Sequence, residues 1–68
     1  MINTDDLNAD AMIDLIQDHE LHISHKDDGE VEVLNYLQGT LISARSHQGV
    51  SDAIKKWAMN FNSITRNR

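Results

Sequence analysis

The most regular part of the chain alternates apolar and polar residues on both sides of a short polar turn. Leu21 and Ile23 belong to the first run, Val31 and Val33 belong to the second, and Asp-Asp-Gly at residues 27–29 lies between them. A period of two places these four apolar side chains on one face of a two-stranded ribbon. The segment therefore predicts a β-hairpin that turns at the Asp-Asp-Gly sequence.

A third strand is predicted soon after the hairpin. Residues 41–46 read Leu-Ile-Ser-Ala-Arg-Ser, and Gln-Gly at residues 38–39 is typical of a turn. Ile42 would then join the inward apolar residues of a three-stranded antiparallel meander. Leu34 and Tyr36 fall on the opposite face and require a bulge or a partly apolar outer face. We expect Tyr36 and Leu41 either to be turned into the core by a local bulge or to be contact residues.

Helical periodicity replaces the alternation near the N-terminus. We expect a helix that begins after Thr4, its N-cap, and ends at about residue 18, with Asp5 in its first turn. Its apolar arc would contain Leu7, Ala9, Ala11, Met12, Ile13, Leu15 and Ile16. The rest of the helix carries an acidic stripe at spacing four, formed by Asp6, Asp10, Asp14 and Asp18. Like charges at this spacing oppose a helix by about 0.2–0.5 kcal/mol per pair, and the stripe is either a solvated face or a surface for basic side chains of a partner.

The C-terminal segment predicts a second amphipathic helix. Ser51 would be its N-cap, and Asp52 would lie in the first turn. One apolar stripe contains Ile54, Trp57, Ala58, Phe61 and Ile64. Burial of this stripe against the sheet would contribute about 1.5–3 kcal/mol for each large side chain. Arg66 and Arg68 lie near the end of the helix, and residues 65–68 are expected to fray.

Together these elements predict a single small α+β domain over residues 1–68. The order is α-β-β-β-α, and a three-stranded antiparallel meander packs against two helices. The alternative is a three-helix bundle, because the apolar residues between 31 and 44 also approximate a helical stripe. Gly39 in the middle of that segment and the β-branched Val31, Val33 and Ile42 favour strands.

The chain is too short to build a large core. A domain of 68 residues buries only about 60% of the surface that its unfolded chain exposes, and the absence of cysteine rules out a disulfide. Self-association or a larger partner would supplement such a core, so a homodimer is one expectation. Residues 1–8 lack the features of a signal peptide, and no apolar run approaches the roughly 20 residues that span a bilayer. We therefore expect a cytoplasmic protein that does not contact a membrane.

The charges are segregated along the chain. The formal net charge is −5, but residues 1–32 contain ten acidic residues and one lysine, whereas residues 33–68 contain five basic residues and one aspartate. The halves either attract each other or present the acidic half to a basic partner. In the second case the partner-binding residues would be Asp6, Asp10, Asp14, Asp18, Asp27, Asp28, Glu30 and Glu32. An alternative surface would contain Tyr36, Arg45, Lys55, Lys56 and Met59.

The four histidines do not match a known catalytic or metal motif. His19 and His22 are three residues apart, whereas the helical zinc-protease motif needs a spacing of four. Residues 27–30 resemble a calcium loop only in composition, and neither a cysteine nor a Gly-x-Ser-x-Gly elbow offers a nucleophile. We expect exposed histidines at the margin of the sheet, and a protein with no enzymatic activity, metal or cofactor.

The predicted order of elements is similar in layout to double-stranded-RNA-binding domains and to some phage anti-CRISPR inhibitors. The second helix departs from the RNA-binding pattern, because only Lys55 and Lys56 provide basic charge in its first turns. The leading hypothesis is a small acidic interaction module, phage-like in character, that acts as a regulator or inhibitor by binding a basic surface of a partner protein. Its narrower form mimics nucleic-acid charge. The alternative is a nucleic-acid-binding dimer that uses the basic C-terminal half.

Overall fold

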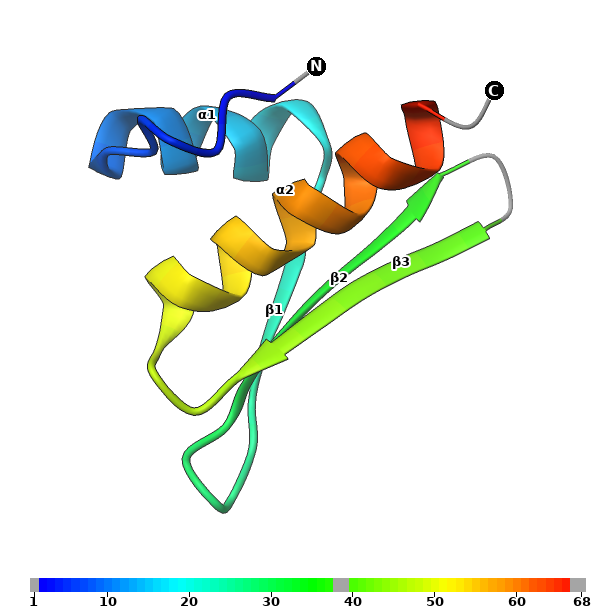
Figure 1. Cartoon of the computed structure of the whole chain (residues 1–68). Coiled ribbons are helices and arrows are strands. Elements are labelled where there is room, and N and C mark those ends of the chain that lie inside the picture. Colours follow the sequence, from blue (N-terminus) through cyan, green and yellow to red (C-terminus); the bar gives the residue numbers. More distant parts are fainter. Residues whose placement is uncertain (1, 38–39, 67–68) are drawn as a thin grey trace.

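The computed structural model describes residues 2–37 and 40–66, which form two helices and three strands (Figure 1). The elements are α1 (Ala9–Asp18), β1 (His22–His25), β2 (Val31–Leu37), β3 (Thr40–Ser46) and α2 (Val50–Arg66). The strands form one antiparallel sheet in the order β1-β2-β3. This arrangement confirms the predicted α+β fold with its meander, and the three-helix alternative is wrong.

The core lies between the helices and one face of the sheet, which we call the inner face. Its buried apolar side chains are Leu21, Val31, Val33, Ile42, Ala44, Ala53, Ile54, Trp57 and Ala58. Met12, Leu15 and Ile16 of α1 pack against this cluster, so both helices lie on the same side of the sheet (Figure 1). The inward positions that the alternation predicted for the hairpin are therefore confirmed.

The opposite face of the sheet, which we call the outer face, is covered by no described helix (Figure 1). Tyr36 and Leu41 are direct cross-strand partners on this face, and their side chains are 75% and 48% exposed. The pairing of β2 with β3 is continuous from Val31 opposite Ser46 to Leu37 opposite Thr40. The described pairing of β2 with β3 therefore contains no bulge, and Tyr36 and Leu41 are exposed on the outer face and not turned into the core.

The hairpin between β1 and β2 turns at the predicted Asp-Asp-Gly sequence. The amide of Lys26 donates to the carbonyl of Glu30 at 2.8 Å, and the amide of Gly29 donates to the carbonyl of Lys26 at 3.1 Å. Gly29 has a φ of 88°, a left-handed conformation that glycine adopts without steric cost. This is a three-residue hairpin loop in which glycine occupies the last position.

Helix α1 begins at Ala9, which is later than predicted. The side-chain oxygen of Asn8 accepts a hydrogen bond from the amide of Ala11 at 2.8 Å, so Asn8 and not Thr4 is the N-cap. The segment before it is held in another direction, because Asn62 of α2 exchanges two hydrogen bonds with the backbone of Ile2, at 2.9 and 2.7 Å. The predicted helical position of Thr4 and of the residues up to Asn8 is therefore wrong.

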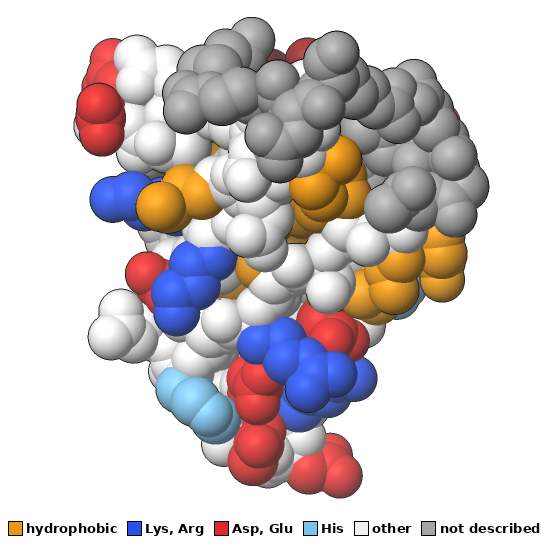
Figure 2. Space-filling view, turned by 45° about the vertical axis from the view of Figure 1, so that its right-hand side comes forward, with side chains coloured by type: hydrophobic (Ala, Val, Ile, Leu, Met, Phe, Trp, Pro, Cys, Tyr) orange, Lys and Arg blue, Asp and Glu red, His pale blue; other side chains and the backbone are white. Residues whose placement is uncertain are grey.

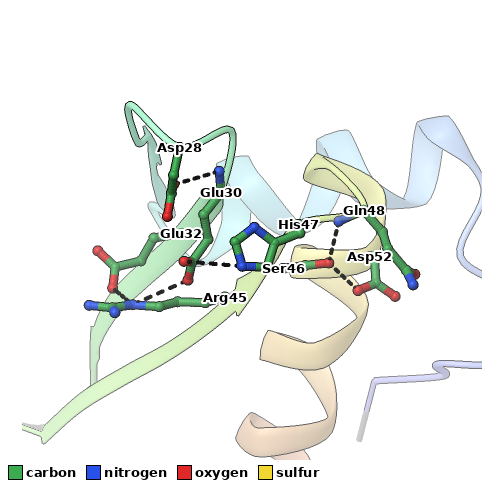
Figure 3. Close-up of polar contacts among 8 residues, drawn as sticks. All are labelled: Asp28, Glu30, Glu32, Arg45, Ser46, His47, Gln48 and Asp52. Atoms are coloured by element: carbon green, nitrogen blue, oxygen red, sulfur yellow. Dashed lines mark hydrogen bonds and ion pairs between the residues drawn. The ribbon is translucent and has the colours of Figure 1, made fainter.

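Helix α2 begins one residue before the predicted cap Ser51. The carbonyl of Gly49 accepts the amide of Ala53 at 3.1 Å, and Asp52 lies in the first turn as predicted. The hydroxyl of the buried Ser46 donates to the Asp52 carboxylate and accepts the amide of Gln48 at 3.0 Å (Figure 3). These bonds join the end of β3 to the start of α2.

Two predictions fall wholly or partly outside the described residues. The turn expected at residues 38–39 is one of them. The other is the expected fraying of residues 65–68. The backbone of α2 is helical through Arg66, and residues 67–68 lie outside the described part of the chain.

Candidate functional site

The structure places seven of the eight predicted partner-binding carboxylates in two groups, and the eighth, Asp6, lies before α1. Asp10, Asp14 and Asp18 lie on α1, which we call the helix group. The second group belongs to the β1–β2 hairpin and consists of Asp27, Asp28, Glu30 and Glu32, which we call the hairpin group. The hairpin tip and α1 lie at opposite ends of the molecule in Figure 1. One partner surface that contains all eight residues is therefore not formed.

Glu30 and Glu32 of the hairpin group form ion pairs within the protein. Arg45 on β3 donates from Nε to Glu32 Oε2 at 2.6 Å and lies 3.8 Å from Glu30 Oε1 (Figure 3). Lys26 Nζ lies 3.4 Å from Glu32 Oε1. Register explains the first contact, because Glu32 and Arg45 are direct cross-strand partners.

Ion pairing also shifts the pKa values of the side chains that take part in it. The hydrogen bond from Arg45 holds the pKa of Glu32 below its ordinary value, although burial of the carboxylate acts in the opposite direction. The same contact raises the pKa of Arg45. The side chain of Glu32 is only 9% exposed, so this carboxylate serves the fold and is not accessible to a partner.

Three possible metal-ligand side chains converge at the hairpin. Donor atoms of Asp28, Glu30 and His47 lie within 4.8 Å of one another, and His47 Nε2 is 3.7 Å from Glu30 Oε2. Asp28 also accepts the backbone amide of Glu30 at 3.0 Å, an interaction that stabilises the turn. The guanidinium of Arg45 already offers a positive charge to Glu30 from within the protein. The contacts that the structure shows for Asp28 and Glu30 are thus a turn hydrogen bond and an ion pair.

The helix group has a different environment. Asp10, Asp14 and Asp18 are exposed, and no basic side chain in residues 2–37 and 40–65 forms an ion pair with them. Their spacing of four corresponds to a rise of about 6 Å per step, so the stripe is about 12 Å long. Asp6 lies outside the helix but lines the same shallow hollow as Asp14, with a volume of about 340 Å³. The structure thus retains an acidic surface on α1 with Asp6 beside it.

An exposed apolar side chain accompanies this acidic stripe. Ile13 is 51% exposed, whereas the sequence placed it in the buried arc of the helix. It is three residues from Asp10 and four residues from Gln17, so it is their neighbour on the helix surface. The sequence contains a signal for this exposure. The predicted apolar arc has seven residues and is too wide for all of them to face the core.

The alternative surface predicted from the sequence is divided between two sides of the molecule. Tyr36 and Arg45 lie on the outer face of the sheet, whereas Lys55, Lys56 and Met59 are exposed on α2, which packs against the inner face. Lys56 Nζ also lies 3.3 Å from Asp52 within α2. Figure 2 shows basic and acidic side chains next to one another toward the hairpin end of the molecule. The described residues therefore do not form one continuous basic surface.

The histidines lie in two kinds of environment. His22, His25 and His47 are exposed near the sheet, as predicted. His19 is partly buried, and its ring centroid lies 5.2 Å from that of Trp57 and 4.9 Å from that of Phe61. The prediction of an exposed histidine is wrong for His19, because the end of α1 meets the aromatic side chains of α2 there.

No protein-family model matches the chain, and neither a curated protein nor a solved structure is significantly similar to it. The similarity in layout to RNA-binding domains and anti-CRISPR inhibitors is thus one of element order and carries no functional argument. In the described part of the chain, neither helix is long and apolar enough to cross a membrane.

Proposed function

We propose that this protein is a small non-enzymatic interaction module, a regulator or inhibitor, that binds a basic surface of a partner protein through α1. The observation that carries the proposal is the row of exposed carboxylates on one helix. Asp10, Asp14 and Asp18 have no ion-pair partner among the described residues, whereas Glu30 and Glu32 have such partners within the protein. Asp27 and Asp28 at the hairpin tip are also unpaired among the described residues, so the regular row on α1 and its apolar neighbour distinguish the helix group.

Ile13 adds an apolar contact to this surface. Protein interfaces combine an apolar centre with a polar rim, and complementary charge increases the rate and specificity of association. A half-exposed isoleucine beside a row of carboxylates has both components. We therefore expect a partner that presents an apolar contact flanked by arginine or lysine side chains.

The narrower form of the hypothesis, mimicry of nucleic-acid charge, receives less support from the spacing. A DNA strand carries one charge for about every 3.4 Å of helix axis, whereas the carboxylates of α1 follow one another at a rise of about 6 Å. The nucleic-acid-binding alternative also lacks a continuous basic surface among the described residues. We therefore favour a basic protein surface of ordinary charge density.

The test is charge reversal on α1. We expect the double variant Asp10→Lys, Asp14→Lys to lose capture of the partner recovered by wild-type protein from its native host, while its circular-dichroism spectrum stays unchanged. Both positions are exposed and lie outside the core, so the fold tolerates the change. Because the attraction is electrostatic, capture by the wild type should also weaken with increasing salt.

The matched control is the double variant Asp27→Lys, Asp28→Lys. It makes the same change in net charge at two exposed positions of the hairpin tip, and its circular-dichroism spectrum is also compared with wild type because Asp28 accepts the amide of Glu30 in the turn. We expect it to retain capture, because the hairpin tip lies far from α1. Undiminished capture by the α1 variant, or equal loss in both variants, would show that α1 is not the binding surface.

A further inference from the structure

The outer face of the sheet combines exposed apolar side chains with balanced charge. Tyr36 and Leu41 form an exposed cross-strand pair, and Leu34 next to them on β2 is partly exposed. We call these three residues the outer patch. Figure 2 shows hydrophobic side chains at the surface close to a group of mixed charges. Exposed apolar side chains that adjoin one another on an uncovered sheet are typical of a contact surface.

The charges beside the outer patch compensate one another. Glu32 lies on the outer face between Lys26 and Arg45, and Arg45 also reaches Glu30. These four residues carry no net charge. The surface of α1, in contrast, carries carboxylates that have no ion-pair partner among the described residues.

We propose that the outer patch binds the outer patch of a second copy of this chain, so that the protein is a two-fold symmetric dimer. The distribution of charge favours this face for contact between two copies. Two molecules that each have a formal net charge of −5 repel each other, and this repulsion is strongest where their α1 surfaces meet. On the outer face Lys26 and Arg45 offset Glu30 and Glu32, so the local repulsion is weaker there and two identical faces meet with apolar side chains in contact.

Dimerisation of this kind supplements a small core. A two-fold contact buries each Tyr36, Leu41 and Leu34 against the same residues of the other copy. The two sheets would pack face to face at about 10 Å, with the helices on the outside. Each α1 then stays exposed on its own side of the dimer, and the contact does not depend on the function proposed for α1.

The test compares two substitutions of exposed apolar residues on opposite sides of the molecule. Purified wild-type protein is expected to approach twice its monomer mass of 7.7 kDa in sedimentation equilibrium as its concentration rises. Tyr36→Glu should weaken the dimer by about tenfold or more, because it places two carboxylates against each other at the two-fold contact. Met59→Glu, at a 54% exposed position on α2, should leave the dimer unchanged.

A second measurement locates the contact. The chain has no cysteine, so Tyr36→Cys and Met59→Cys each introduce a single thiol. Mild oxidation is expected to join Tyr36→Cys chains through a disulfide and to leave Met59→Cys chains as monomers, because only the former thiols meet across the two-fold axis.

Three outcomes would overturn the proposal. The first is a wild-type protein that stays monomeric at all accessible concentrations. The second is a dimer that Met59→Glu disrupts and Tyr36→Glu does not. The third is a pure protein that is monomeric but captures a different protein through Tyr36, which would assign the outer patch to that protein. None of them bears on the charge-reversal test of α1.

Discussion

Glu32 is a polar residue at an outward-facing position of β2 that nevertheless becomes part of the folded structure. The alternation of β2 directs it to the outer face, where a carboxylate is expected to be solvated. It is buried instead, and its carboxylate pairs with Arg45 of the neighbouring β3 and with Lys26 of the loop that follows β1. Sequence reasoning identified its face correctly. It missed the burial, which depends on cross-strand register.

We expect the stability of the protein to fall in acid through Glu32 and Asp52. The pKa of each carboxylate is lowered in the folded state, by the hydrogen bond from Arg45 and from Ser46, respectively. A group whose pKa is lower in the folded than in the unfolded state stabilises the fold above its unfolded value, which is about 4.5 for glutamate. That contribution is lost as the pH falls through the folded pKa. Urea unfolding between about pH 7 and about pH 3 measures this loss.

The variant Glu32→Gln distinguishes the contribution of Glu32 to the pH dependence of stability from that of Asp52. We expect it to be less stable than wild type at neutral pH, because it removes both ion pairs of Glu32. Its stability should also fall less on acidification, since only the contribution of Asp52 remains. An equal loss of stability in both proteins over the acidic range would show that Glu32 does not contribute to the pH dependence.

At the scale of elements, the sequence predicted the strands and α2 well. Alternation and a suitable turn located the hairpin, and one apolar stripe located α2. The start of α1 was wrong because the decisive contact joins Ile2 to Asn62, which are 60 positions apart in the chain. Such a contact leaves no local signal. The sequence did carry a signal for the exposure of Ile13, the excessive width of the apolar arc, but which residue of the arc is exposed depends on how α1 packs on the core.

The end of α1 contains a residue in an unfavourable conformation. Glu20 has a φ of 52°, and the amide of Leu21 donates to the carbonyl of Ile16 at 3.0 Å. This is the Schellman arrangement, in which glycine usually occupies the left-handed position. A residue with a Cβ atom is strained there by about 1–2 kcal/mol.

We therefore expect Glu20→Gly to increase the free energy of unfolding by up to about 1 kcal/mol, because the relieved strain exceeds the added entropy of the unfolded chain. Urea unfolding measures the change. The control Glu20→Ala removes the same charge but keeps a Cβ atom, and it should give no such gain. If both variants were stabilised equally, the cause would be the charge and not the backbone conformation.

At the scale of the whole molecule, the fold distributes the charges of the chain unevenly. Arg45 of the basic half pairs with Glu30 and Glu32 of the acidic half, so the two halves attract each other within the fold. The exposed carboxylates without an ion-pair partner among the described residues lie on α1, in the residues before it and at the hairpin tip. The segregation of charge was visible in the sequence. The sequence did not show which carboxylates form ion pairs, because these pairs depend on which strands become neighbours.

The element that carries this free charge is also anchored more weakly than α2. Helix α1 contains no fully buried residue, whereas α2 buries Ala53, Ile54, Trp57 and Ala58. Local opening requires less free energy where few apolar contacts are lost. We expect backbone amides of α1 to exchange with deuterium faster than those of α2, which mass spectrometry of peptic fragments measures. Equal protection of both helices would contradict this expectation.

A surface on such a helix recognises its partner at a thermodynamic cost. Opened molecules do not present the row of Asp10, Asp14 and Asp18, so the apparent affinity is reduced by the fraction that is open. Substitutions that strengthen the packing of α1 would then tighten binding only as far as they remove this open fraction. Loss of packing at Leu15 or Ile16 would weaken binding from the buried side of the helix. Affinity in this protein would thus be tuned from within its own core.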